Sequence, residues 1–108
     1  MPIPELTHLQ FAILGYLIGS EKAGREIREM LNQEGAQKSG PAFYQLMSRL
    51  EDAKLVKGRY EQKTVEGVVI KERRYEITTQ GMSAWQLTRD FYFEQSAMKL
   101  SLGGLAGV

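Results

Sequence analysis

The sequence predicts a mostly α-helical fold with a small two-stranded β-wing: a winged helix-turn-helix followed by one long C-terminal helix. Three observations lead to this prediction. Apolar residues recur at helical spacing in three segments before residue 54. The pattern then changes to that of two strands, over residues 55–63 and 68–78. A last helical pattern extends from residue 79 to about residue 100.

The first two helices are short. The first is expected over residues 7–18, with Thr7 as the residue that caps its free N–H groups. Its apolar face consists of Leu9, Ile13, Tyr16 and Leu17. The second is expected over residues 23–33, and Gly35 is a plausible stop in the left-handed conformation. Its buried stripe consists of Ile27, Met30 and Leu31.

The third helix has the clearest local pattern. Ser39 or Gly40 caps it, and Pro41 fits its first turn because the missing N–H of proline would be unpaired there. Its apolar face consists of Phe43, Leu46, Met47, Leu50 and Ala53. Its opposite face carries Tyr44, Gln45, Ser48, Arg49 and Asp52. A helix with this pattern packs one side on the core and presents the other to solvent.

The two strands are joined by a turn at residues 64–67. Gly67 can adopt the positive φ that a hairpin turn requires. In the second strand, Tyr75 and Ile77 fall on one face of the ribbon, and alternate residues fall on the other.

The fourth helix carries a broad apolar band. Its members are Ala84, Trp85, Leu87, Thr88, Phe91, Tyr92 and Met98. Such a band is wider than one helix on a small domain needs, so we expect a second copy of the chain to cover it. The resulting division is a winged-helix domain over residues 1–78, a dimerisation helix over 79–100 and a flexible glycine-rich tail over 101–108.

The positive charge is concentrated in the middle of the chain. The net charge of all 108 residues is only +1. Residues 37–74 contain nine basic and five acidic side chains, whereas the segments on either side are net negative. A local positive surface can attract phosphate even when the whole chain is nearly neutral. The simpler reading, an unevenly charged solvated surface, also accounts for this distribution.

The sequence carries no recognisable catalytic or cofactor motif. The absence of cysteine excludes disulfides, a thiolate nucleophile and cysteine-ligated zinc, and it is compatible with the cytoplasm, where we expect the protein. His8, the one histidine, is better explained as a helix-start residue than as a metal ligand. There is no phosphate-binding loop or nucleophile motif, and no apolar run long enough for a membrane span. We therefore expect no enzyme activity, cofactor, metal or membrane partner.

Two segments of the sequence resemble the PadR-like family of bacterial transcriptional regulators. The first contains Phe43–Tyr44, Arg49–Leu50–Glu51 and Leu55–Val56, and the second runs from Arg73 to Thr78 and is followed by Gly81. The resemblance covers roughly residues 6 to 92. It implies a short-type regulator in which one C-terminal helix forms the dimer contact. Pro41–Ala42, Gln45 and Lys54 depart from the family's usual residues, on or beside the third helix.

In a winged helix the third helix enters the major groove of DNA. Arg49 suits a phosphate or a guanine edge, and Gln45 suits an adenine edge. Tyr44 and Ser48 suit phosphates, and Lys38 and Ser39 stand at the start of the same helix. An ordinary solvated helix face is the alternative interpretation of these residues.

The predicted ribbon contributes further candidate phosphate contacts. These are Lys63, Lys71, Arg73 and Arg74, of which Lys63 and Arg73 are the first choices. Charges on an exposed ribbon also prevent edge-to-edge aggregation, so both roles remain open.

The expected function is that of a transcriptional regulator, a repressor by resemblance, which binds a pseudo-palindromic operator in double-stranded DNA as a homodimer. Trp85, Leu87, Thr88, Phe91, Tyr92 and Met98 would form the dimer interface. Some members of the family bind flat aromatic compounds between their C-terminal helices, so the resemblance extends to a small aromatic effector at this interface. The alternative is a winged-helix adaptor that binds proteins and no nucleic acid.

Overall fold

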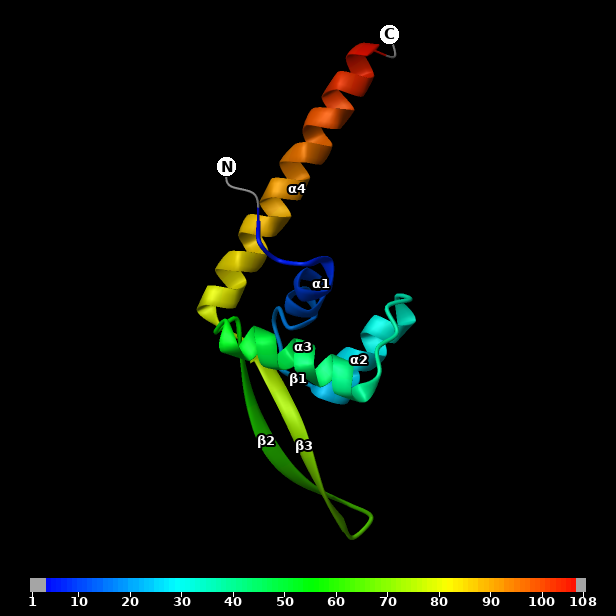
Figure 1. Cartoon of the computed structure of the whole chain (residues 1–108), viewed down its shortest axis with the longest axis vertical. Coiled ribbons are helices and arrows are strands. Elements are labelled where there is room, and N and C mark those ends of the chain that lie inside the picture. Colours follow the sequence, from blue (N-terminus) through cyan, green and yellow to red (C-terminus); the bar gives the residue numbers. More distant parts are fainter. Residues whose placement is uncertain (1–3, 107–108) are drawn as a thin grey trace.

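A computed structural model describes residues 4–106 of the chain, and within them the side chains of residues 4–96. It confirms the predicted fold class: helices, a β-hairpin wing and a long last helix (Figure 1). The elements in order are α1 His8–Tyr16, β1 Lys22–Ala23, α2 Gly24–Gln33, α3 Gly40–Asp52, β2 Val56–Val65, β3 Val68–Ile77 and α4 Thr79–Ala106.

The helix starts follow from their capping residues. The Thr7 hydroxyl accepts a hydrogen bond from the Gln10 N–H at 3.1 Å, and the Gln10 side chain accepts one from the Thr7 N–H at 3.0 Å. These reciprocal bonds pair two N–H groups that a helix start leaves open. Ser39 caps α3 in the same way, through the N–H of Ala42, and Pro41 occupies the first turn as predicted.

The sheet has three strands, where the sequence predicted two. Its order is β1-β3-β2, and the short β1 pairs antiparallel with β3, with Lys22 opposite Tyr75. A two-residue strand has no alternation to detect, which is why the periodicity missed it. The wing itself has a two-residue turn in which Glu66 (φ +52°) and Gly67 (φ +78°) are both left-handed. Such a turn matches the twist of the flanking strands and fixes their register.

The core lies among α1, α2, α3 and the base of the wing. The largest fully buried side chains of this core are Ile13, Leu14, Leu17, Ile27, Leu31, Phe43, Met47 and Leu50. Val56 and Tyr75 extend it onto the sheet. The predicted apolar faces of the first three helices thus meet in one cluster, except that Met30 lies outside it and Ala53 is exposed.

The start of α4 is fixed to the end of α3. The Thr78 hydroxyl donates to the carbonyl oxygen of Lys54 at 2.7 Å and accepts from the N–H of Gly81 at 2.9 Å. A Cβ on Gly81 would overlap the carbonyl of Leu55, so only glycine allows this approach. The junction therefore sets the direction in which α4 leaves the domain.

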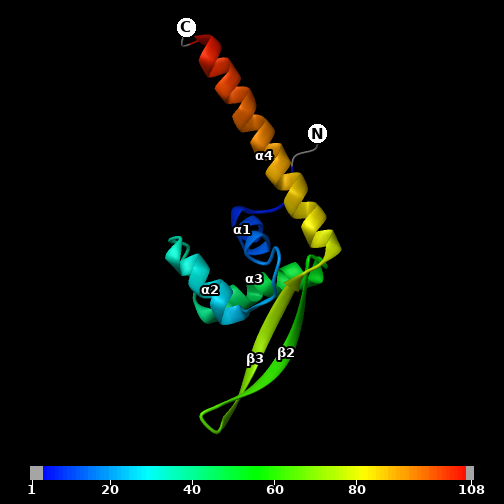
Figure 2. The same ribbon diagram turned by 180° about the vertical axis from the view of Figure 1, so that it is seen from behind.

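Only the first part of α4 packs on the domain. Trp85 stacks on Phe11 of α1 with ring centroids 5.7 Å apart. Thr88, about one turn further along, is still buried, and beyond it the helix projects away from the other elements (Figures 1 and 2). The helix continues to Ala106 rather than ending near residue 100, so residues 101–106 of the predicted tail are helical. Extending an existing helix costs less than starting one, which lets it pass Gly103 and Gly104.

No helix within residues 4–106 is both long enough and apolar enough to cross a membrane.

Candidate nucleic-acid interface

The outer face of α3 is polar and open to solvent. Gln45, Ser48 and Arg49 are exposed, and Tyr44 has 42% of its surface exposed. The opposite face is anchored by Phe43, Met47 and Leu50, which are completely buried. The predicted division of α3 into two faces is thus confirmed. The helix is held rigidly from behind and presents side chains with hydrogen-bonding capacity.

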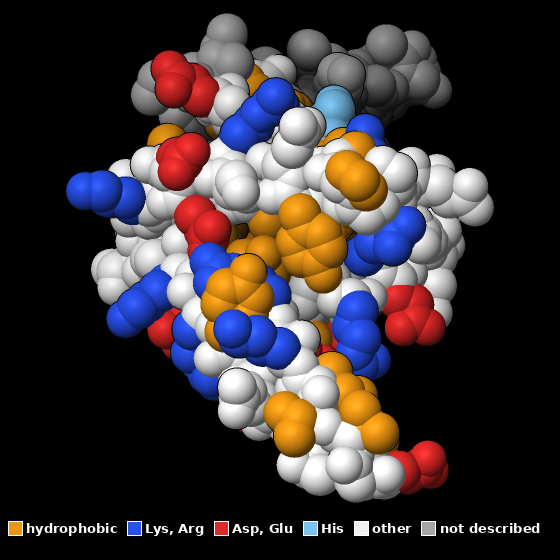
Figure 3. Space-filling view, turned by 60° about the horizontal axis from the view of Figure 1, so that its bottom comes forward, with side chains coloured by type: hydrophobic (Ala, Val, Ile, Leu, Met, Phe, Trp, Pro, Cys, Tyr) orange, Lys and Arg blue, Asp and Glu red, His pale blue; other side chains and the backbone are white. Residues whose placement is uncertain are grey.

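Two grooves flank this helix. The first lies between α3 and the wing and is lined by Tyr44, Ser48, Glu51, Tyr60, Lys71, Arg73 and Tyr75. The second lies between α3 and the start of α1 and is lined by Thr7, His8, Leu9, Lys38, Ala42, Gln45, Leu46 and Arg49. We call them the wing groove and the α1 groove. Figure 3 looks toward the wing end of the molecule, where Lys and Arg side chains gather around exposed hydrophobic ones.

The wing groove contains an internal ion pair. Arg73 donates to the Glu51 carboxylate at 2.5 Å, and both side chains are only 25% exposed. The Arg73 guanidinium also lies 4.7 Å from the centre of the Tyr60 ring. A Cβ on Gly58 would overlap both partners of the pair, so the glycine makes room for it. This contact connects the C-terminal end of α3 to the wing.

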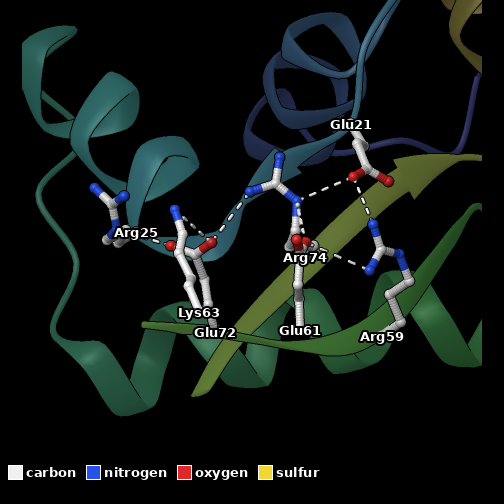
Figure 4. A network of polar contacts seen from close by, with 7 residues as sticks. All are labelled: Glu21, Arg25, Arg59, Glu61, Lys63, Glu72 and Arg74. Carbon is white, nitrogen blue, oxygen red and sulfur yellow. Dashed lines mark hydrogen bonds and ion pairs between the residues drawn. The ribbon is translucent and has the colours of Figure 1, made fainter. Parts of the chain in front are cut away.

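A larger network joins the base of the wing to the body (Figure 4). Arg74 contacts Glu21 at 3.0 Å, Glu61 at 3.3 Å and Glu72 at 3.1 Å. Glu72, which is only 8% exposed, also accepts from Arg25 at 3.0 Å and lies 3.5 Å from Lys63. Arg59 completes the network through Glu21 and Glu61. Four cations are therefore opposed by three carboxylates.

The network shifts the titration of its carboxylates. Burial by itself raises the pKa of Glu72, but hydrogen bonds from Arg25 and Arg74 and the charge of Lys63 outweigh it, so the pKa is lowered. The hydrogen bond from Arg74 is the main cause that lowers the pKa of Glu21. Both carboxylates therefore stay ionised in the folded protein and neutralise the neighbouring cations.

The predicted phosphate contacts fall into two groups. Lys63, Arg73 and Arg74 each face a carboxylate of the same chain. Lys38, Arg49 and Lys71 have no ion pair among the side chains of residues 4–96, although Lys71 lies 5.1 Å from the centre of the Tyr60 ring. The sequence count of basic residues did not distinguish paired from unpaired charge.

The tip of the wing is apolar, a feature that the sequence analysis missed. Val65, Val68, Val69 and Ile70 are between 43% and 65% exposed. The only charged residue among residues 64–70 is Glu66, which is acidic. The sequence did contain a signal for this apolar tip. It has three consecutive apolar residues, Val68, Val69 and Ile70, in a strand with no opposing layer.

The residues predicted for the dimer interface also fall into two groups: some pack within the chain and others are exposed. Thr88 is only 1% exposed, and the half-buried Trp85 stacks on Phe11, so both contribute to packing within the chain, and their role in a dimer interface stays a prediction. The buried Thr88 hydroxyl donates to the Ala84 carbonyl at 2.8 Å. The projecting part of α4 exposes other apolar residues, namely Leu87, Tyr92 and Phe93.

Phe91 is half-buried. Met98 lies beyond residue 96, the last residue whose side chain is described. Phe93, the most exposed large hydrophobic residue among the described side chains at 72%, was missed because it falls off the predicted stripe. Leu87, Tyr92 and Phe93 thus leave apolar surface exposed on more than one side of the projecting helix.

No family model and no curated protein matches the sequence. Solved structures match the fold. A PadR family transcription regulator from Clostridium difficile has a TM-score of 0.70 at 19% identity, over 90% of this chain and 100% of that one. A PadR-like transcriptional regulator from Bacillus cereus has a TM-score of 0.68 at 25% identity, over 87% of this chain and 89% of that one.

Bacillus subtilis PadR in complex with operator DNA matches with a TM-score of 0.61 at 23% identity, over 74% of this chain and 46% of that one. The chain therefore has the winged-helix fold of a transcription regulator. Within that class its fold is PadR-like, which confirms the resemblance found in the sequence. The Clostridium difficile and Bacillus cereus neighbours are named as transcription regulators, in agreement with the prediction that the chain is not an enzyme.

Proposed function

We propose that this chain is a DNA-binding transcription regulator that inserts α3 into the major groove as one half of a homodimer. The observation that carries the proposal is the polar outer face of α3, anchored to the core from behind and flanked by a groove on each side. A major groove about 12 Å wide admits one helix, and a sugar-phosphate backbone then lies on each side of it.

Different residues of α3 would contact the bases and the phosphates of the DNA. Gln45 can pair with an adenine edge and Arg49 with a guanine edge, because both side chains are exposed on the outer face. Tyr44, Ser48 and Ser39 supply hydrogen bonds to phosphates, which position the helix without reading sequence. The match to a PadR structure solved with operator DNA supports this orientation of the fold.

The wing contributes fewer phosphate contacts than its charge suggests. Lys71 and the 40% exposed Lys63 are its best candidates. Arg73 and Arg74 would contact phosphate only by sharing their charge with Glu51, Glu21 or Glu72. In the proposed complex these two arginines mainly hold the wing at a fixed angle to α3.

Direct binding tests this proposal. Affinity for a random-sequence duplex, measured at several salt concentrations, is expected to fall steeply as salt rises, because bound phosphates release counterions. Arg49→Ala is expected to weaken binding, whereas Arg89→Ala, which removes an exposed arginine of α4 paired with Asp90, is the matched control. Absence of binding by the folded wild-type chain at low salt would contradict the proposal.

The dimer part of the proposal rests on the projecting half of α4. An isolated helix is marginal in water, and the exposed Leu87, Tyr92 and Phe93 would be covered by the same helix of a second chain. Two such chains would hold two α3 helices for a pseudo-palindromic operator and repress transcription by occupying it. A flat aromatic effector would lie between the α4 helices, near Phe91 and Tyr92.

Light scattering tests the dimer. The wild-type chain is expected to have twice the monomer mass at micromolar concentration, and Phe93→Asp is expected to shift it toward monomer. Glu94→Ala, an exposed neighbour, is the control. A wild-type monomer would contradict the dimer and leave the DNA-binding proposal to its own test.

A protein-binding adaptor is the second candidate, and the apolar wing tip favours it. Val65, Val68, Val69 and Ile70 form a surface without a cation, which suits another protein better than DNA. An adaptor would show no salt-dependent DNA affinity, and substitution of Arg49 would not affect its binding. The duplex titration therefore separates the two candidates.

A further inference from the structure

A further groove lies beside the start of α4, away from the two grooves that flank α3. It is lined by Pro4–Leu6 of the N-terminal segment, by Ala53 and Leu55 after α3, and by Ala84 and Leu87 of α4. The N-terminal segment lies beside α4 in both views (Figures 1 and 2). We call this the α4 groove. Its lining is largely apolar, and it adjoins the point where α4 leaves the domain.

Both walls of the α4 groove are held in place. The N-terminal segment is fixed by the reciprocal bonds between Thr7 and Gln10 at 3.0 and 3.1 Å, and Leu6 packs against the core. The start of α4 is fixed by the bonds of the Thr78 hydroxyl at 2.7 and 2.9 Å. The groove therefore needs little ordering when it is filled, which lowers the entropy lost on binding.

One row of apolar positions runs from this groove to the end of α4. Its members, separated by 3, 4, 7, 4 and 3 residues, are Ala84, Leu87, Phe91, Met98, Leu102 and Leu105. Such intervals keep positions on one side of a helix and are typical of two helices packed together. The seven-residue interval contains Gln95 in place of an apolar residue.

The intervals of this row are the same in both directions along the helix. An antiparallel second copy of α4 therefore matches the row with itself. It places position 105 opposite Ala84, position 102 opposite Leu87 and position 98 opposite Phe91. The positions that line the groove in one chain are thus opposed by the helix end of the other chain.

The end of α4 cannot cover the groove of its own chain. At about 1.5 Å per residue along one continuous helix, Leu105 lies about 30 Å from Ala84. Residues 97–106 nevertheless contain only one charged residue, Lys99, and a helix that is apolar on most sides has to be covered. Only another copy of the chain brings this segment and this groove together.

Charge and continuity favour the same pairing. Glu5 is the one charged residue in the groove lining as the described side chains define it, and Lys99 has the opposite sign, so no like charges meet. Leu87 belongs both to the groove and to the exposed surface of α4. A standard interface involves about 20–30 residues on each chain, more than one side of α4 supplies, and the groove extends that surface.

We propose that residues 97–106 of α4 in one chain occupy the α4 groove of a second chain, so that the two α4 helices pack antiparallel and each domain holds the helix end of the other. This inference rests on the homodimer of the proposed function. The exchange fixes the direction of the α4 pair and thereby the separation of the two α3 helices. That separation determines which half-site spacing the dimer fits.

Cross-linking tests the pairing directly, because the chain contains no cysteine of its own. Ala84→Cys combined with Leu105→Cys in the full-length chain is expected to form a covalent dimer with a short bismaleimide reagent, seen as doubled mass on a denaturing gel. Neither single variant is expected to cross-link, because position 84 of one chain faces position 105 of the other. Ala84→Cys with Val69→Cys, at the exposed wing tip, is the control pair.

A charge in the groove tests its role in dimer stability. Ala53→Arg places a cation where the apolar helix end would pack and is expected to raise the Kd of the dimer by about tenfold or more. Gln86→Arg adds the same charge at an exposed position of α4 outside the groove and is the control. Sedimentation velocity over a dilution series measures both, and circular dichroism checks that the variants fold.

The outcomes are distinguishable. A wild-type dimer that gives no covalent dimer with the 84 and 105 cysteines, or that cross-links equally through Ala84→Cys alone, would overturn the antiparallel exchange while the dimer itself stands. An Ala53→Arg dimer as stable as the Gln86→Arg dimer would place the groove outside the interface and overturn the inference as well. A wild-type monomer would overturn the proposed homodimer, and this inference with it.

Discussion

The two sides of α3 differ in how their positive charge is used. On the wing side, Arg73 is paired with Glu51, and the network at the base of the wing matches four cations with three carboxylates. On the α1 side, Lys38 and Arg49 line a groove whose lining, among the described side chains, includes no carboxylate. The number of basic residues in a segment therefore does not measure how much of its charge is unpaired. The arginines of the wing stabilise the position of the wing relative to α3, while the cations of the α1 groove remain available to bind phosphate.

The largest expected effect separates the two sides directly. Lys38→Ala combined with Arg49→Ala is expected to reduce DNA affinity by about 10- to 100-fold and to reduce the salt slope by about 1, because Lys38 loses a phosphate contact and Arg49 loses a base contact. The matched double variant, Arg25→Ala with Arg59→Ala, removes two paired cations of the network and is expected to have a much smaller effect. Fluorescence anisotropy with one labelled duplex measures both. A larger loss for the network variant would reverse the comparison.

The next effect concerns stability. Glu51→Ala leaves the half-buried Arg73 guanidinium without its carboxylate and is expected to lower the free energy of unfolding by about 1–3 kcal/mol. Urea denaturation measures the loss. Asp52→Ala, at the exposed neighbouring position, is the control and is expected to change it by less than about 0.5 kcal/mol. Equal losses in the two variants would show that the pair does not hold the wing.

A smaller effect, an increase in DNA affinity, is expected from a substitution in the ion-pair network of the wing. Glu72→Gln removes the carboxylate that opposes Arg25, Lys63 and Arg74, so these cations become available to phosphate. DNA affinity is expected to rise by up to about fivefold, which corresponds to about 1 kcal/mol. Glu76→Gln, exposed on the same strand, controls for the change in net charge. An equal gain in both variants would mean that net charge alone is responsible.

The smallest effect is a dependence of stability on acid pH. The pKa values of Glu72 and Glu21 are lower in the folded chain than in ordinary carboxyls. Their stabilising contribution is therefore fully present above the unfolded value, about pH 4.3, and is lost as pH falls through the lower folded values. Thermal unfolding between pH 7 and pH 3 is expected to show this decline, and Glu72→Gln is expected to make it shallower. An unchanged decline in the variant would exclude Glu72 as a cause.

The sequence by itself determined the elements and the outer face of α3. Helical and strand periods, the caps at Thr7 and Ser39 and the glycine of the wing turn are local properties, so they predicted most boundaries closely. The exposed positions of Tyr44, Gln45, Ser48 and Arg49 followed from the same helical period.

Only the tertiary structure decided which charges are paired and which apolar residues are covered. Glu21 and Arg74, or Glu51 and Arg73, lie far apart in the chain, and nothing in local spacing indicates that they meet. The same reason applies to Trp85 and Thr88: their helical stripe alone could equally face a second chain, but in the fold Trp85 stacks on Phe11 of α1 and Thr88 is buried within the chain. Periodicity shows which side of a helix is apolar, whereas the partner of that side depends on how distant segments pack.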